Sequence, residues 1–197
     1  MKKILGAALA AGATVSAAGA AEAQVSASVT LTSDYVFRPM SLSSADRAIQ
    51  GSFAYATDSF YVGVWGTSLA SNSPASVELD VYAGLTPTLG PVAFDLGVVG
   101  YFYPGADDNG AEFDFFEAVL GASTAITERF TLGGQLAFSP ENWGETGEAL
   151  YTEINGAFAI SDAFAISAAF GNYRIEALKG PLARSPSDTY TTRNLGA

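Results

Sequence analysis

Acidic residues recur inside the segments with the strongest β-strand pattern, and they are the groups in this chain best able to do chemistry. Neighbouring residues of a strand point to opposite faces of the sheet, so residues two apart share a face. Glu78 and Asp80 therefore share one face, as do Glu153 and Asn155. Asp95 shares a face with Gly97 and lies opposite Phe94. The candidate residues on the polar face are Glu78, Asp80, Asp95, Glu117, Glu153 and Asn155.

These carboxylates have two interpretations. An unpaired carboxylate in lipid is costly, so in a membrane-spanning sheet they must face a watery interior. An acidic lining would favour the passage of cations over anions. Alternatively the carboxylates form an interior network of ion pairs and hydrogen bonds with Arg174, Arg129 or Arg38. Both readings remain open at this point.

Enzymatic chemistry has little support in the sequence. The chain contains no histidine and no cysteine, so the Ser-His-Asp and Cys-His nucleophile systems cannot be built. The usual ligands of zinc and other transition metals are missing too. We therefore expect no catalytic residues, no metal site and no cofactor.

The sequence predicts that the carboxylates lie on a sheet of about ten antiparallel strands. Residues 25–37 alternate between apolar and polar side chains over more than a dozen positions, and residues 76–86 repeat that pattern. Such alternation is typical of a sheet with one apolar and one polar face. The expected strands are 25–37, 48–57, 60–69, 76–86, 92–103, 112–123, 129–139, 149–160, 163–175 and 188–197.

The connections between these strands alternate in length, and the hairpins repeat. Phe60, Phe94, Phe130 and Phe164 each follow a short turn, about 35 residues apart, which indicates one reused supersecondary unit. Longer polar loops occupy the other ends, at 38–47, 70–76, 104–111, 139–148 and about 176–187. Short turns on one side and long loops on the other are the layout of an outer-membrane barrel. The prediction is an all-β, antiparallel up-and-down transmembrane β-barrel.

Aromatic residues also collect near the ends of the expected strands. In a membrane barrel they would form the two aromatic girdles at the lipid–water interfaces. Ordinary strand propensity is the alternative explanation for each of them. The residues concerned include Tyr35, Phe37, Phe60, Phe102, Phe113, Phe115, Phe138 and Tyr151.

Composition and the first residues place the chain in the cell envelope. Lys2 and Lys3 precede an alanine-rich apolar run and the small residues around Ala23, which is the pattern of a secretory signal peptide. We expect residues 1–23 to be the signal peptide and 24–197 a single barrel domain. The net charge of −11 disfavours binding to nucleic acid. The 49% apolar residues are many for an exported soluble domain.

The first motif of the mature chain resembles the TorF family of porins, which are proteobacterial outer-membrane β-barrels. The resemblance rests on Ser33, Asp34, Tyr35, Phe37 and Arg38, and it continues through residues 41–43, 48–55, 60–66 and 77–84. It implies an outer-membrane location, outer-membrane lipid and the barrel-assembly machinery as partners, and small polar solutes or cations as cargo. It leaves the oligomeric state and the solute undefined.

The chain departs from the pattern of the TorF family in two respects. Family members usually carry Arg-Gly where this chain has Arg38 and Pro39, so we expect the first loop to turn differently. They also run on through further strands, about 12 in a full-length relative, whereas this chain ends at Ala197 within the expected tenth strand. A fragment, a frameshifted gene and a shortened relative would each explain such a C-terminal truncation.

The leading hypothesis is a porin of the outer membrane that passes small polar solutes or ions through an acidic lumen. The alternative is a non-conducting structural or interaction barrel whose interior is filled with side chains. A soluble periplasmic barrel that binds an apolar ligand is a third reading. The apolar residues expected on the outer face, such as Val77, Leu79 and Val81, argue against it.

Overall fold

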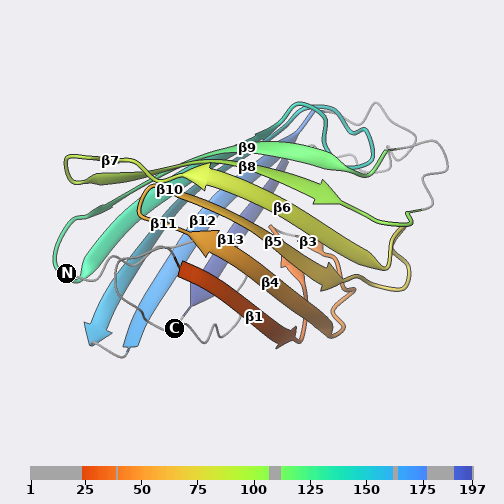
Figure 1. The fold of residues 1–197 in the computed structure, drawn as a ribbon, viewed down its shortest axis with the longest axis horizontal. Coiled ribbons are helices and arrows are strands. Elements are labelled where there is room, and N and C mark those ends of the chain that lie inside the picture. The colour runs from red at the N-terminus through yellow and green to blue at the C-terminus, as the bar shows by residue number, and fades with distance from the viewer. Residues whose placement is uncertain (1–23, 39, 107–111, 162–163, 177–188, 197) are drawn as a thin grey trace.

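The computed structural model describes residues 24–38, 40–106, 112–161, 164–176 and 189–196 (Figure 1). The expected signal peptide and Pro39 lie outside these ranges. Ten strands follow one another in a single antiparallel sheet, in the order in which they occur in the chain. They are β1 Gln24–Thr32, β4 Ala48–Ala56, β5 Phe60–Ser68, β6 Val77–Leu85, β8 Val92–Phe102, β9 Phe115–Ala125, β10 Phe130–Ser139, β11 Ala149–Ser161, β12 Phe164–Ile175 and β13 Thr189–Gly196.

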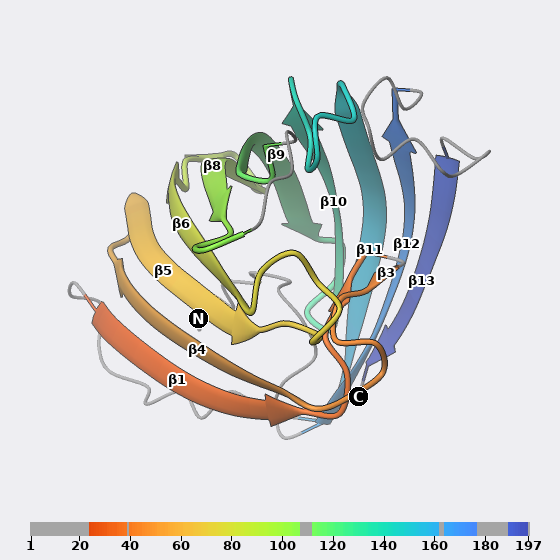
Figure 2. The same cartoon turned by 90° about the vertical axis from the view of Figure 1, so that its right-hand side faces the viewer.

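Three short strands complete the fold. β7, Thr88–Leu89, pairs with β8 and brings the main sheet to 11 strands. β2, Val36–Phe37, and β3, Met40–Ser41, form a separate two-stranded hairpin. Figure 2 shows the main sheet curving from β1 at one edge to β13 at the other, with β3 inside the curve. The all-β, antiparallel, up-and-down arrangement of the sheet is confirmed, and no strand pairing joins β1 to β13 in the residues that are described.

The alternation of residue types separates the two faces of the sheet. On the convex face each main strand presents at least one exposed large apolar side chain. On the concave face small and polar residues meet, and the hydroxyls of Ser28 and Ser52 are hydrogen-bonded across β1 and β4 at 2.7 Å. Exposed apolar residues, one from each main strand, are Val29, Phe53, Val64, Val81, Val98, Phe116, Leu136, Ile154, Phe170 and Leu195.

Two boundaries and part of the aromatic pattern differ from the sequence-based expectation. The first strand ends at Thr32 rather than at residue 37, because the chain turns at Ser33 and Asp34 and enters the β2–β3 hairpin. The strand expected at 112–123 is β9, which begins only at Phe115. Among the aromatic residues near strand ends, Phe60 and Phe138 are exposed, but four are buried, so for these four the girdle prediction is wrong. The buried ones are Tyr35, Phe113, Phe115 and Tyr151.

Inward-facing tyrosines pack across glycines of neighbouring strands. The Tyr61 ring lies where a Cβ at Gly84 or Gly97 would be, and the Tyr82 ring does the same at Gly63. Tyr61 can therefore lie flat along the concave face, and its hydroxyl donates a hydrogen bond to Asp95 Oδ1 at 2.7 Å. The glycine content of these strands thus makes room for polar aromatic side chains on the inner face.

Replacing Gly84 with alanine should destabilise the fold because the new methyl group collides with the Tyr61 ring. We expect a loss of about 1–3 kcal/mol in the free energy of unfolding, the usual cost of overpacking, measured by urea denaturation and circular dichroism. Gly51→Ala is the matched control, since its nearest neighbour would be Ser28 O at 3.7 Å. Equal effects of the two substitutions would contradict this account of the packing.

Candidate functional site in the concave face

All six residues expected on the polar face lie on the concave side of the sheet. Glu78 and Asp80 project from β6, Glu117 from β9, Asp95 from β8, and Glu153 and Asn155 from β11. Glu78, Asp80 and Glu117 are buried, whereas the other three are half-buried. The buried three cluster near the β2–β3 hairpin, so this end of the concave face is the candidate site.

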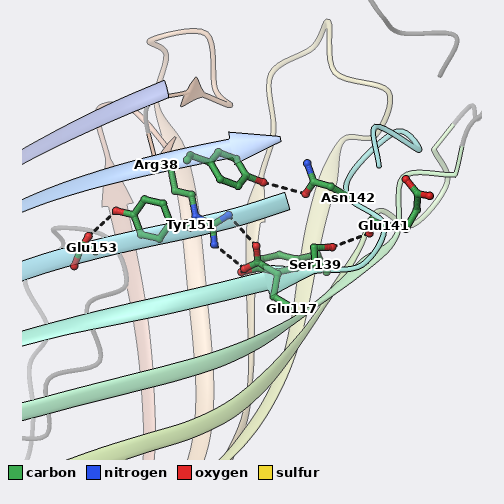
Figure 3. A network of polar contacts seen from close by, with 9 residues as sticks. Arg38, Glu117, Ser139, Glu141, Asn142, Tyr151 and Glu153 are labelled. Atoms are coloured by element: carbon green, nitrogen blue, oxygen red, sulfur yellow. Dashed lines mark hydrogen bonds and ion pairs between the residues drawn. The ribbon is translucent and has the colours of Figure 1, made fainter. Parts of the chain in front are cut away.

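A bidentate ion pair lies at the centre of the site. Arg38 donates from Nη1 to Glu117 Oε1 at 2.8 Å and from Nη2 to Glu117 Oε2 at 2.7 Å (Figure 3). The Tyr101 hydroxyl adds a third hydrogen bond to Glu117 Oε2 at 3.0 Å. Only 9% of the Arg38 side chain and 1% of the Glu117 side chain are exposed. Bidentate guanidinium–carboxylate pairs are among the strongest polar contacts in proteins.

Aromatic rings surround the same guanidinium. Its central carbon lies 4.4 Å from the ring centre of Tyr173, 4.5 Å from that of Tyr151 and 4.6 Å from that of Phe37. Cation–π attraction at a desolvated site stabilises such contacts. The three rings come from β2, β11 and β12, so Arg38 connects the hairpin to strands of the main sheet that are distant in sequence from it.

The hairpin reaches into the concave face at the cost of backbone strain. Arg38 adopts a left-handed conformation with φ of +54°, which is unfavourable for a residue other than glycine. A second anchor is Tyr35, whose hydroxyl donates to Glu78 Oε1 at 2.7 Å and whose ring lies 5.3 Å from that of Trp65. The amide of Leu42 donates to Tyr35 O at 2.7 Å. The contacts of the Arg38 side chain and those of Tyr35, three residues earlier, thus hold Arg38 in its strained conformation.

Asp34 binds the serine hydroxyls at the end of the β2–β3 hairpin. Its Oδ1 accepts hydrogen bonds from the hydroxyls of Ser41 at 2.6 Å and Ser43 at 2.7 Å. These hydroxyl donors stabilise the charged carboxylate and lower the pKa of Asp34 below its ordinary value of 3.8. The Tyr35 amide also donates to Ser43 Oγ at 2.8 Å. The motif residues Ser33, Asp34, Tyr35, Phe37 and Arg38 therefore form a turn and an inward hairpin instead of the end of a strand.

Of the three arginines considered as partners for the interior carboxylates, the structure pairs only Arg38 with one of them. Arg174 lies on the convex side of β12 and is exposed, and Arg129 is exposed in the turn before β10. Tyrosine hydroxyls, instead of arginines, bind the other carboxylates, and the sequence pattern did not predict this. Tyr61 binds Asp95, and Tyr151 donates to Glu153 Oε2 at 2.6 Å, while Asn155 donates to Glu153 Oε1 at 3.0 Å.

The chemistry available in this site is electrostatic. In the ranges that the structure covers, no group of three or more His, Cys, Asp or Glu side chains is arranged to hold a metal ion. No helix of those ranges is long and apolar enough to cross a membrane. The site combines one paired arginine, several carboxylates and a set of tyrosine hydroxyls, which can attract, order or exclude charged solutes.

One comparison with known proteins gave a match. A family model described as "Bacterial protein of unknown function (Gcw_chp)" matches residues 16–192, which include nearly all of the sheet and the whole candidate site. Neither the curated proteins nor the solved structures compared with the chain yielded a match.

Removing the charge of Arg38 should destabilise the fold strongly. Arg38→Met leaves Glu117 buried without its cation, so we expect a loss of about 3–5 kcal/mol in the free energy of unfolding. Adding Glu117→Gln should cost much less than the same change in the wild-type background. A double-mutant cycle by urea denaturation measures this coupling, with the exposed Arg47→Met as the control. Additive effects of the two substitutions would show that the ion pair contributes nothing.

Asp34 should make the stability sensitive to acid. Because its pKa is lowered in the folded state, the contribution is complete above the ordinary value of 3.8 and disappears as the pH falls through the lower folded value. The free energy of unfolding should therefore fall less steeply below about pH 4 in Asp34→Asn than in the wild type. Superimposable pH profiles of the two proteins would contradict this role.

Proposed function

The chain belongs to the Gcw_chp family of bacterial proteins, and we propose that it is an outer-membrane β-barrel of the porin type. In this proposal small polar solutes or cations pass through an acidic interior. The signal peptide directs export, and the barrel-assembly machinery inserts the strands into outer-membrane lipid. The resemblance of residues 33–38 and the following strands to the TorF family of porins supports the same assignment.

The proposal rests on a burial pattern opposite to that of a soluble protein, with apolar side chains exposed and carboxylates buried. Large apolar side chains are exposed on the convex face of all ten main strands, while Glu78, Asp80 and Glu117 are buried on the concave face. Soluble monomers rarely expose so much contiguous apolar surface. A membrane barrel needs this arrangement, with an apolar band against lipid and a polar interior. Most of the main strands have 9 to 13 residues, enough to cross the hydrocarbon when tilted.

Membrane insertion requires that both edges of the sheet be paired. Lipid cannot satisfy the free backbone groups of an open edge. β1 and β13 are the two edges of the sheet. In the proposed barrel they pair with each other or with further strands, and the curvature of the sheet in Figure 2 is compatible with this arrangement.

A non-conducting barrel is the second candidate, and the β2–β3 hairpin is the observation that favours it. Arg38, Tyr35 and Phe37 occupy space on the concave side, where they contact strands β6, β8, β9, β11 and β12. Such a filled interior would narrow or close the path of solutes. The protein would then serve as a structural or interaction barrel.

Recordings in planar lipid bilayers separate the two candidates. A porin with this acidic lining should show discrete conductance steps and a reversal potential that favours cations under a salt gradient. Asp95→Asn together with Glu153→Gln should shift this potential toward zero, because both half-buried carboxylates lie on the concave face. Glu128→Gln, in an exposed turn, is the control and should leave the potential unchanged.

Two results would contradict the porin. Protein that is inserted in the bilayer but produces no conductance steps would support the filled barrel instead. Conductance whose cation preference is the same in the double variant would show that these carboxylates do not set selectivity.

A further inference from the structure

Two carboxylates beside the Arg38–Glu117 ion pair are buried without a matching positive charge. Glu78 is 1% exposed and Asp80 is 2% exposed. Glu78 Oε1 accepts the hydrogen bond from Tyr35, and the Tyr103 hydroxyl also lies against this carboxylate, but Glu78 Oε2 and Asp80 Oδ1 accept no hydrogen bond. The two residues are adjacent on the concave face of β6. Two acidic oxygens are therefore free on the same face of one strand.

The nearest cation cannot neutralise these carboxylates. Both terminal nitrogens of Arg38 are engaged by the two oxygens of Glu117. The described chain contains no other ion pair within the concave face. Buried charged groups in proteins are paired or coordinate metal ions, because an isolated buried charge is very costly. Glu78 and Asp80 must therefore either bind a positive charge or hold protons.

An independent observation comes from the neighbouring strands. Gln50 on β4 is directly opposite Thr67 on β5, which is directly opposite Glu78, so the three side chains form one row on the concave face. Gln50 is 6% exposed, and its Nε2 has no hydrogen-bond partner. A half-turn of the amide places Oε1 at that position. Thr67 Oγ1 donates to Ser68 O, and its lone pairs remain able to accept.

We propose that this row, together with the adjacent Asp80 on β6, holds a hard divalent cation of the calcium type. Glu78 Oε2 and Asp80 Oδ1 supply the charge of −2, and the Gln50 amide oxygen and the Thr67 hydroxyl supply neutral oxygens. Calcium takes carboxylate, amide and water oxygens in flexible geometry, so two carboxylates are sufficient where neutral oxygens and water complete the shell. The site does not depend on whether the barrel conducts.

The site also contains its own reporter. Trp65 on β5 is directly opposite Asp80 on β6, and its ring packs against that of Tyr35, whose hydroxyl donates to Glu78. An indole this close to a bound lanthanide transfers excitation energy to it. Terbium, which takes calcium sites, can therefore be detected by emission sensitised through Trp65.

The test is a terbium titration of the full chain purified in detergent, with excitation of tryptophan. The wild type should give a saturable emission that calcium displaces. Asp80→Asn, and separately Gln50→Leu, should weaken terbium binding at least about tenfold, because ligand charge and number set the affinity. Asp95→Asn removes a carboxylate of the same face that already has Tyr61 as partner, and it should leave binding unchanged. Trp65→Phe should lower the emission while calcium still raises the unfolding temperature.

Three outcomes would overturn the proposal. The first is the absence of saturable emission in the folded wild type. The second is emission that Asp80→Asn and Asp95→Asn reduce equally, which indicates diffuse binding to an acidic protein. The third is an unfolding temperature that calcium does not change in the wild type but that Asp80→Asn raises, which indicates a carboxyl group kept neutral by a proton.

Discussion

A carboxylate buried on the inner face of a β-sheet must find a partner, and this requirement organises much of the molecule. Glu117 lies at the end of the concave face near the β2–β3 hairpin, and only 1% of its side chain is exposed. Without Arg38 its burial would cost several kcal/mol. The bidentate pair and the three aromatic rings around Arg38 stabilise a hairpin that belongs to no part of the main sheet.

The other features of the interior follow from the same requirement. Arg38 accepts a left-handed backbone because its guanidinium then reaches Glu117. Tyr35, Tyr61, Tyr101 and Tyr151 each donate a hydroxyl to a carboxylate of the concave face. Glycines on neighbouring strands make space for two of these rings, those of Tyr61 and Tyr151. The interior is therefore built from tyrosine–carboxylate contacts, with one arginine paired to the buried Glu117.

The sheet itself could be predicted from the sequence, because alternation reports directly on which face a side chain occupies. The ten main strands and the inward direction of Glu78 and Glu117 follow from that pattern, and the order of the strands follows from the alternation of short turns and long loops. The inward hairpin could not be predicted in this way, because residues 33–37 continue the alternation of the first strand. Its position depends on contacts between Arg38 and strands β9, β11 and β12, and local pattern contains no information on such distant pairs. The choice of Arg38 over Arg174 has the same origin.

In the proposed barrel the convex face contacts lipid while the concave face encloses the polar interior. The chain has no cysteine, so single cysteines at positions 96, 97, 98 and 99 of β8 can carry nitroxide spin labels in lipid vesicles. We expect the accessibility to alternate, with labels at Leu96 and Val98 accessible to oxygen and protected from a water-soluble nickel chelate. Labels at Gly97 and Val99 should show the opposite preference or be shielded from both. Free access of the nickel chelate to positions 96 and 98 would show that the convex face is in water rather than in lipid.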